Sequence, residues 1–238
     1  MHKFLIIAIV ISFTVVTFPQ QQKKYFDAPF GGGVGYVPAW YIPNLDPVNM
    51  ELKAIGMPEL TTSGFYSSGG AGFIYLGFIK FLRIGGMGYG GAATSSQNNR
   101  EVVYNLGGGG ITIEYTLPIV KDIALSVGAI IGAGTLKIQM YRNSGSFTWQ
   151  ETWEEFASDA SSSFSRTLEN SYWMLTPTVN LDFPLNRFIL LRLGAGYQLA
   201  FNDEWTGDNE QELKNVPSDL NANTFFIQSG LFIGFFSF

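Results

Sequence analysis

The chain has 238 residues, of which 46% are hydrophobic and only 14% are charged, well below the roughly 25% of charged residues found in soluble domains. Its formal net charge is −5, so it lacks the excess of Lys and Arg that neutralises phosphates, and we expect no nucleic-acid partner. The absence of Cys excludes disulfides, lipid attachment through Cys and thiolate metal sites.

Residues 1–20 have the pattern of a secretory signal peptide. Met1–Lys3 is short and basic, Phe4–Val16 is apolar, and the residues that follow are polar. The apolar stretch is shorter than the roughly 20 residues of a spanning helix, which favours cleavage, between residues 17 and 22, over an uncleaved anchor. Residues 21–29 would then form a short N-terminal periplasmic segment.

Eight segments of alternating apolar and polar residues follow, which predicts β-strands. Alternation is clearest in the seventh, where Leu191 and Leu193 share one face and Arg192 lies on the other. No later segment is apolar for long enough to be a spanning helix, and such a chain is typical of a transmembrane β-barrel. The predicted strands are Phe30–Tyr41, Gly64–Gly77, Phe81–Ser95, Glu101–Leu117, Ile123–Tyr141, Tyr172–Phe183, Phe188–Asn202 and Thr224–Phe238.

The connections between these strands alternate in length. Outer-membrane barrels have short periplasmic turns, longer external loops and an even number of strands. The pattern therefore predicts an all-β fold, an eight-stranded antiparallel transmembrane β-barrel over residues 30–238. Short links lie at Phe78–Lys80, Pro118–Asp122 and Pro184–Arg187, long links lie at 42–63, 142–171 and 203–223, and the link at 96–100 is of modest length.

The first long link contains signals for a short helix. Asp46 is a favourable N-cap residue, Pro47 suits the first helical position, and Gly56 with Pro58 beyond it favours termination. We expect a helix near Pro47–Ile55 in the first external loop.

The last predicted strand is uncharged and ends in Phe236-Ser-Phe238, which resembles the C-terminal signature that outer-membrane barrels present to the barrel-assembly machinery. With the signal segment and the strand pattern, residues 28–238 resemble the small eight-stranded barrels of OmpA/OmpX-like architecture. The resemblance implies a monomer in the outer membrane of a Gram-negative bacterium, with outer-membrane lipid and the assembly machinery as partners and Phe236 and Phe238 as the assembly signal. Alternation alone leaves open which face of this strand meets lipid.

Four charged residues, Arg83, Glu114, Asp182 and Arg192, fall within the predicted strands, at inward positions wherever the alternation defines a face. Eight strands enclose an interior just wide enough for side chains. An isolated charge there is costly and opposite charges offset that cost, so we expect a lumenal ion-pair network. Inward glycines such as Gly128 and Gly194 leave room for the long side chains. The network either plugs the barrel or gates a narrow pore, and the small barrel favours the plug.

Catalysis is not expected. The sole histidine, His2, lies in the predicted signal peptide, so the mature chain would lack both His and Cys, on which the usual nucleophile–base pairs and metal sites depend. Acid pairs in the two longest loops are a formal alternative, but solvated loop acids are far commoner. We therefore predict no enzyme activity, no cofactor and no metal site.

The long loops also carry Trp149, Trp153 and Trp205. Exposed aromatics mark binding surfaces, but an aromatic girdle at the membrane interface is the commoner arrangement. The leading interpretation is a non-enzymatic outer-membrane protein with a structural or surface-interaction role through its external loops, towards an unspecified surface ligand or partner protein. The alternatives are a narrow passive pore for small solutes and a lipocalin-like lumenal binder, which would place its apolar face inward.

Overall fold

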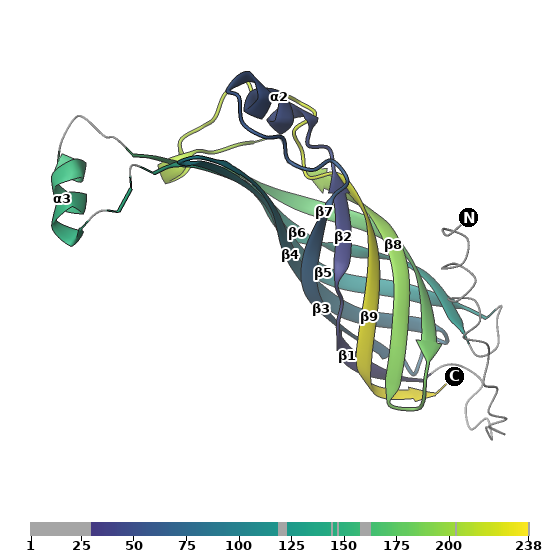
Figure 1. Cartoon of the computed structure of the whole chain (residues 1–238). Coiled ribbons are helices and arrows are strands. Elements are labelled where there is room, and N and C mark those ends of the chain that lie inside the picture. The colour runs from purple at the N-terminus through teal and green to yellow at the C-terminus, as the bar shows by residue number, and fades with distance from the viewer. Residues whose placement is uncertain are drawn as a thin grey trace, which may run out of the picture.

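The computed structural model describes residues 30–118, 123–143, 145–146, 148–157, 163–202 and 204–237. The predicted signal peptide, the segment 21–29 and Phe238 lie outside the described residues. The described chain forms a closed antiparallel β-barrel with an arm of longer strands on one side (Figure 1). In the part of the chain that the structure describes, no helix is long and apolar enough to cross a membrane.

Nine strand segments form the barrel. Each strand from β3 to β9 pairs with the next in chain order, and β1 and β2 both pair with β3 on one side and with β9 on the other, which closes the ring. The segments are β1 (Phe30–Tyr36), β2 (Ala39–Pro43), β3 (Phe65–Tyr75), β4 (Leu82–Gln97), β5 (Arg100–Leu117), β6 (Ala124–Arg142), β7 (Phe164–Pro184), β8 (Ile189–Phe201) and β9 (Thr224–Ser237).

β1 and β2 are two parts of one strand position. The Val37 N–H donates to the Gly69 carbonyl (2.9 Å), and the Pro38 carbonyl accepts from the Ser229 N–H (3.0 Å), so the ladders continue across the gap. The gap arises because Pro38 has no N–H to donate. The barrel therefore has eight strand positions, and the predicted eight-stranded antiparallel fold is confirmed.

The two ends of the barrel differ as the link lengths predict. β3, β5, β7 and β9 end, and β4, β6 and β8 begin, at the end that also holds Phe30, where the connections are short. The opposite end carries the three long connections, with helix α2 (Asp46–Ala54), helix α3 (Trp149–Ala157) and the 3₁₀ turn η1 (Asp208–Glu210), and the two-residue turn between β4 and β5. If the short-turn end is periplasmic, the helices are external.

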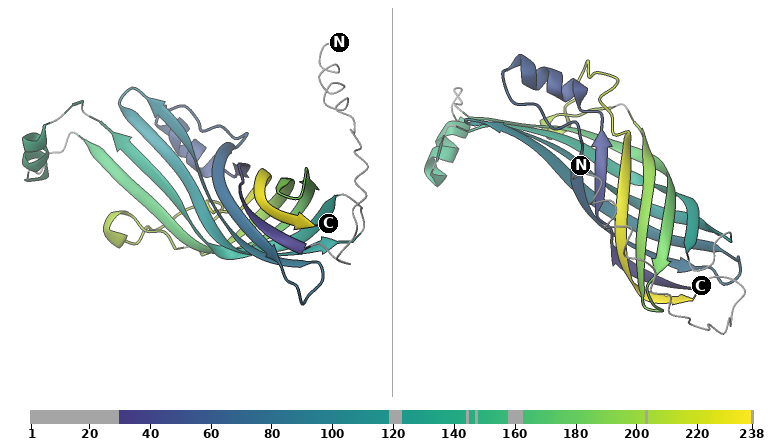
Figure 2. Two further views of the ribbon diagram at one scale, coloured as in Figure 1. Left: turned by 90° about the horizontal axis from the view of Figure 1, so that it is seen from below. Right: turned by 45° about the vertical axis from the view of Figure 1, so that its right-hand side comes forward.

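The three longest strands extend well beyond what a bilayer requires. β5, β6 and β7 contain 18, 19 and 21 residues, whereas a transmembrane strand needs about 9–11. The prediction that the sixth strand begins at Tyr172 was wrong, because β7 already begins at Phe164 and pairs with β6 up to Arg142. These extensions form the arm that carries α3 (Figures 1 and 2).

α2 matches the predicted helix within one residue at each end. Asp46 is not the N-cap, however, since Leu45 takes that position and Asp46 lies in the first turn, where its N–H donates to Asn44 Oδ1 (3.1 Å). Gly56 follows the helix with φ +73°, the left-handed conformation that commonly ends helices and favours glycine.

Outward positions form an uncharged belt around the barrel. From Leu125 to Ala133 on β6 and from Trp173 to Phe183 on β7, every second residue points outward and none of these residues is charged. Nine and eleven residues match the length of a membrane-crossing strand. Side chains of the belt that are at least half exposed include Val34, Ile74, Ile111, Ile131, Val179, Leu193, Ile227 and Ile233.

The orientation of β9 resolves the face that alternation left open. Leu231, Ile233 and Phe235 point outward and are about half exposed or more, whereas Phe232 and Phe236 are buried inside the barrel. The uncharged outward belt therefore continues across the pairing of β9 with β1, where the ring closes.

Candidate functional site

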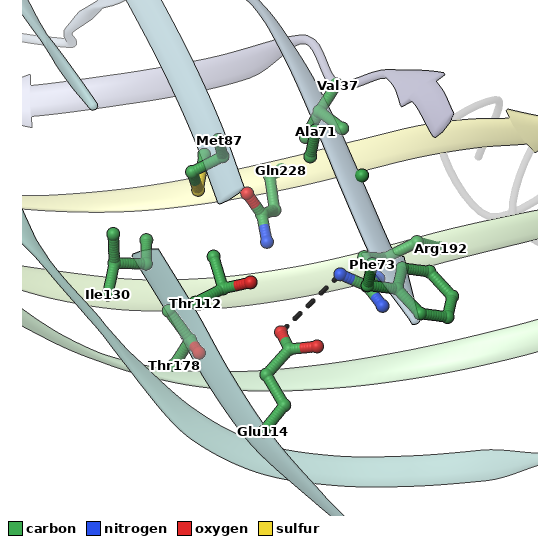
Figure 3. A pocket seen from close by; sticks show the side chains of 11 residues that line it. Val37, Ala71, Phe73, Met87, Thr112, Glu114, Ile130, Thr178, Arg192 and Gln228 are labelled. Atoms are coloured by element: carbon green, nitrogen blue, oxygen red, sulfur yellow. Dashed lines mark hydrogen bonds and ion pairs between the residues drawn. The ribbon is translucent and has the colours of Figure 1, made fainter. Parts of the chain in front are cut away.

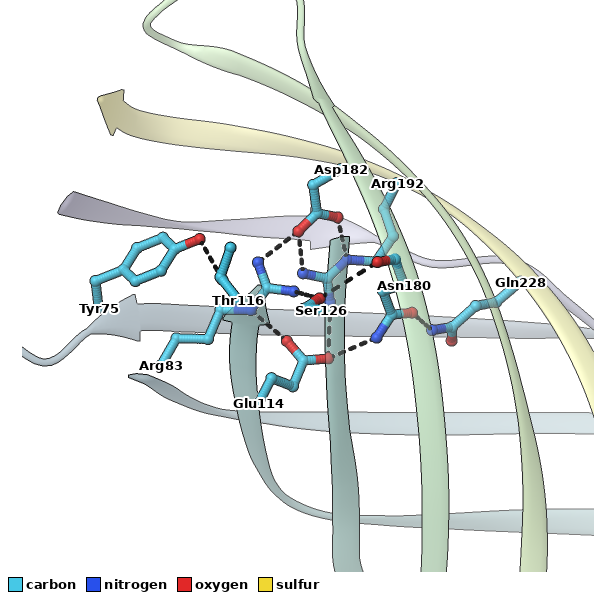
Figure 4. Close-up of polar contacts among 9 residues, drawn as sticks. All are labelled: Tyr75, Arg83, Glu114, Thr116, Ser126, Asn180, Asp182, Arg192 and Gln228. Atoms are coloured by element: carbon cyan, nitrogen blue, oxygen red, sulfur yellow. Dashed lines mark hydrogen bonds and ion pairs between the residues drawn. The ribbon is translucent and has the colours of Figure 1, made fainter. Parts of the chain in front are cut away.

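The four charged residues predicted for the lumen lie together inside the barrel (Figure 4). Arg83 on β4 faces Glu114 on β5, and Asp182 on β7 faces Arg192 on β8, as cross-strand neighbours. Arg83 Nε lies 2.5 Å from Glu114 Oε2, and Arg192 Nε lies 2.7 Å from Asp182 Oδ1. All four side chains are at least nine-tenths buried. They constitute the lumenal network.

The two cross-strand pairs are joined across the lumen. Arg83 also contacts Asp182 through Nη1, and Arg192 Nη1 lies 3.4 Å from Glu114 Oε1. Each guanidinium therefore bridges both carboxylates, and two positive charges balance two negative ones. Such balance, with hydrogen bonds on the remaining donors, is what makes buried charge tolerable.

Three uncharged polar side chains complete the lumenal network. Gly194 leaves the space they need, since a Cβ there would lie 2.0 Å from Asn180 Oδ1. They are Ser126, which accepts from Arg83 Nη2 (2.6 Å), Asn180, which donates to Glu114 Oε1 (2.7 Å), and Gln228, which donates to Asn180 Oδ1 (2.8 Å).

An aromatic cluster packs against the same network. The Arg83 guanidinium lies 4.6 Å from the Phe73 ring centroid, and the Arg192 guanidinium lies 4.9 Å from that of Phe232, within the range of cation–π attraction. Phe236, predicted as part of an assembly signal, points inward and lies 6.0 Å from Phe73 between ring centroids. Phe238 lies outside the described residues.

A small cavity lies beside the network (Figure 3). Its volume is about 10 Å³, and Glu114, Thr178, Arg192 and Gln228 line it. This is room for about one water molecule. The Thr178 hydroxyl and Gln228 Oε1, which have no hydrogen-bond partner among the described residues, supply polar groups at its wall. The cavity is too small for a solute.

The mouth of the barrel at the end with the long connections is closed by a second, apolar plug. Leu45 and Leu52 of the α2 region are 1% and 2% exposed, and Trp205 is 4% exposed. These residues belong to one cluster with Tyr104 and Leu136 on the inner faces of β5 and β6. The barrel is therefore filled at two levels, ionic near the short turns and apolar at the mouth.

Trp205 differs from the prediction. It was expected as an exposed loop aromatic, but the segment that carries it folds inward, and the Thr206 and Glu169 backbones pair at 2.8 and 2.9 Å along the edge of β7. Burial removes its indole from any external contact surface. No local pattern signals this burial, because the packing partners of a loop lie far away in the chain.

Trp149 and Trp153 are exposed as predicted, at 78% and 57%, but they lie on a helix that the sequence analysis missed. α3 begins with a capping box, in which the Thr148 N–H donates to Glu151 Oε2 (2.6 Å) and the Glu151 N–H donates to Thr148 Oγ1 (3.2 Å). The Thr148-x-x-Glu151 spacing was the available signal.

The described residues hold no group of three or more His, Asp or Glu side chains placed to bind a metal ion. The carboxylates of the lumenal network are each paired with guanidinium groups, and the cavity that Glu114 lines admits only water. This arrangement offers no substrate space around its titratable groups.

Comparisons with known proteins return solved structures only. No family model and no curated protein matches the chain. The attachment invasion locus protein Ail of Yersinia pestis matches with 11% identity over 88% of this chain and 100% of that chain (TM-score 0.43). A major outer membrane protein of Thermus thermophilus matches with 9% identity over 87% and 99% (0.49), and OprG of Pseudomonas aeruginosa with 13% identity over 88% and 94% (0.41). The barrel fold of this chain is established by its own closed hydrogen-bond ladder.

Proposed function

We propose that this chain is a non-enzymatic outer-membrane β-barrel with a closed lumen, which serves as a rigid scaffold for external structures. The observation that carries the proposal is the double plug, an ionic network at one level and an apolar cluster at the mouth. In this proposal the closed barrel is a stable membrane anchor, and its role is to support the arm.

The outward belt supports the location. Its side chains are apolar over nine to eleven residues per strand, and the strands of the ring pair with neighbours on both sides, as a bilayer requires. The polar and charged side chains gather inside. A lipocalin-like binder would show the reverse distribution and a larger cavity.

The plug also supports the scaffold over the narrow pore. Opening a passage would require Arg83 and Arg192 to leave both carboxylates, and uncompensated buried charges are strongly destabilising. The apolar cluster at the mouth would have to move as well. A scaffold needs neither change.

The test is conductance together with fractionation. The purified full-length protein, reconstituted in planar bilayers, should add no steady conductance, and the native protein should fractionate with outer membranes and show heat-modifiable migration on gels. Leu52→Asp, which places a carboxylate in the apolar plug, serves as a variant in which leaks are expected. A large, steady conductance of the wild type would reject the closed scaffold in favour of the pore.

A further inference from the structure

α3 stands apart from the plugged barrel, at the end of the hairpin of β6 and β7. In Figure 1 and in both views of Figure 2 it lies well to one side of the barrel wall. A helix held in this place is within reach of whatever stands next to the barrel in the same membrane.

One face of α3 is aromatic and uncovered. Trp149, Trp153 and Phe156 are spaced i, i+4 and i+7, which places them on one side of a helix. They are 78%, 57% and 84% exposed. Large aromatic side chains grouped in this way on a surface mark interaction sites more often than scattered apolar residues do.

The face is also preformed. The capping box of Thr148 and Glu151 fixes the first turn, and Gln150 Nε2 donates to Glu154 Oε1 (3.2 Å) one turn later. The Trp149 and Trp153 rings meet edge to face at 5.6 Å between centroids. A surface that is ordered before binding loses less conformational entropy when it docks.

The charge of α3 restricts the kind of partner that can bind its aromatic face. The helix contains Glu151, Glu154 and Glu155 and no Lys or Arg. Helices that bind membrane surfaces are typically rich in Lys and Arg, and anionic headgroups would repel this one. A second copy would bring an equally acidic helix and a chain of the same net charge, −5.

From the aromatic face and this charge, we infer that α3 docks onto a neighbouring protein of the cell envelope, in an apolar groove rimmed by Lys and Arg. The aromatic side chains fill the groove and Glu154 meets its basic rim, which is the helix-in-groove mode of recognition with complementary charge. The inference rests on the proposed function, because it assigns a partner class to the external arm of the scaffold.

The test uses photo-crosslinking on intact cells that make the full-length protein. Benzoylphenylalanine replaces Trp153 in one strain, and in the matched control it replaces Trp173, another exposed tryptophan (71%) that lies on the outward face of β7. We expect a protein adduct from position 153 that is absent from position 173. Mass spectrometry should map it to a groove with apolar walls and more Lys and Arg than acids at its rim.

Two second-site variants test the two halves of the inference. Phe156→Ala, which removes an anchor, and Glu154→Lys, which reverses a charge, should each lower the adduct yield by about tenfold, while Glu154→Gln should lower it less. Heat-modifiable migration of each variant confirms that the barrel has assembled.

Four outcomes would overturn the inference: an adduct with lipid, an adduct with a second copy, an adduct in a groove without basic residues, or no adduct from an assembled barrel. None of these crosslinking outcomes changes the conductance expected of the wild-type protein in planar bilayers. A steady wild-type conductance would reject the closed scaffold without changing the adduct, so the two failures are distinguishable.

Discussion

Arg192 and Asp182 lie opposite each other on β8 and β7 and share two hydrogen bonds, Nε to Oδ1 at 2.7 Å and Nη2 to Oδ2 at 3.0 Å. This bidentate geometry is the strongest form of an arginine–carboxylate contact. Removing either residue leaves the other buried with only one oppositely charged partner, Glu114 for Arg192 or Arg83 for Asp182.

Arg192→Ala should therefore lower the free energy of unfolding by about 3–5 kcal/mol, measured by urea unfolding in lipid or detergent. The matched control is Arg166→Ala, since Arg166 forms an exposed pair with Asp208 (3.5 Å) and should cost less than about 1 kcal/mol. Equal effects of the two substitutions would contradict a buried, coupled network.

Gly194→Ala should destabilise the barrel by about 1–3 kcal/mol, because the new methyl group displaces Asn180 from Glu114 and Gln228. Gly90→Ala is the control, since a Cβ at Gly90 meets nothing within 4 Å and should change the free energy of unfolding by less than about 0.5 kcal/mol. Comparable losses for the two glycines would show that strand flexibility, and not lumenal space, decides the cost.

Trp205→Ala should open the external mouth. Loss of a large buried side chain costs about 3–5 kcal/mol, and hydrogen exchange at the Thr206 amide, which pairs with Glu169, should accelerate accordingly. Trp149→Ala, which removes an exposed ring, should leave that exchange unchanged. Unaltered protection in the Trp205 variant would argue against the apolar plug.

Single cysteines test the orientation, since the chain contains none. A membrane-impermeant maleimide should label Asn209→Cys, in the long link before β9, on intact cells, and it should label Leu185→Cys, in the short link after β7, only after lysis. Both positions are exposed. The reverse pattern would invert the barrel.

Acidification should loosen α3. The Thr148 N–H holds the pKa of Glu151 below its ordinary value, so the cap is complete above the pKa of an unfolded glutamate, about 4.3. Its stabilisation is lost as the pH falls through the lower, folded value. NMR titration of the Glu151 side chain should show the depressed pKa, and Thr148→Ala should weaken the shift. A Glu151 that titrates at its ordinary pKa would contradict the capping box.

The strand positions were predictable because apolar and polar residues alternate along a barrel strand as they do along the strands of other sheets, so the sequence shows which face is which. The lumenal network was foreseeable for the same reason, since Glu114 and Asp182 occupy inward phase in strands of clear alternation. The contact between Arg83 and Asp182 was not, because β4 and β7 are not neighbours, and only the closure of the ring brings them together.

The β7 half of the arm was missed for a physical reason of its own, whereas β6 was predicted as far as Tyr141. Beyond the belt, β6 and β7 carry residues such as Lys137 and Glu169, which pair with each other at 3.0 Å and belong in water. Polar residues on the outward face of a strand outside the membrane resemble those of a loop, so the first part of β7, from Phe164 to Ser171, was assigned to the long link at 142–171. The burial of Trp205 depends on tertiary packing that leaves no local trace.

The ring closes between the first and the last strand of the described chain, with Gly33 opposite Gly234 and Tyr36 opposite Leu231. These partners are separated by nearly the whole barrel sequence, so their pairing bears the largest loop-closure entropy in the fold. Until β9 is present, β8 and the strand position of β1 and β2 both expose unpaired edges that invite association with other strands. Completion of the barrel must therefore wait for the C-terminal strand, and chains held before that step are the ones most exposed to aggregation.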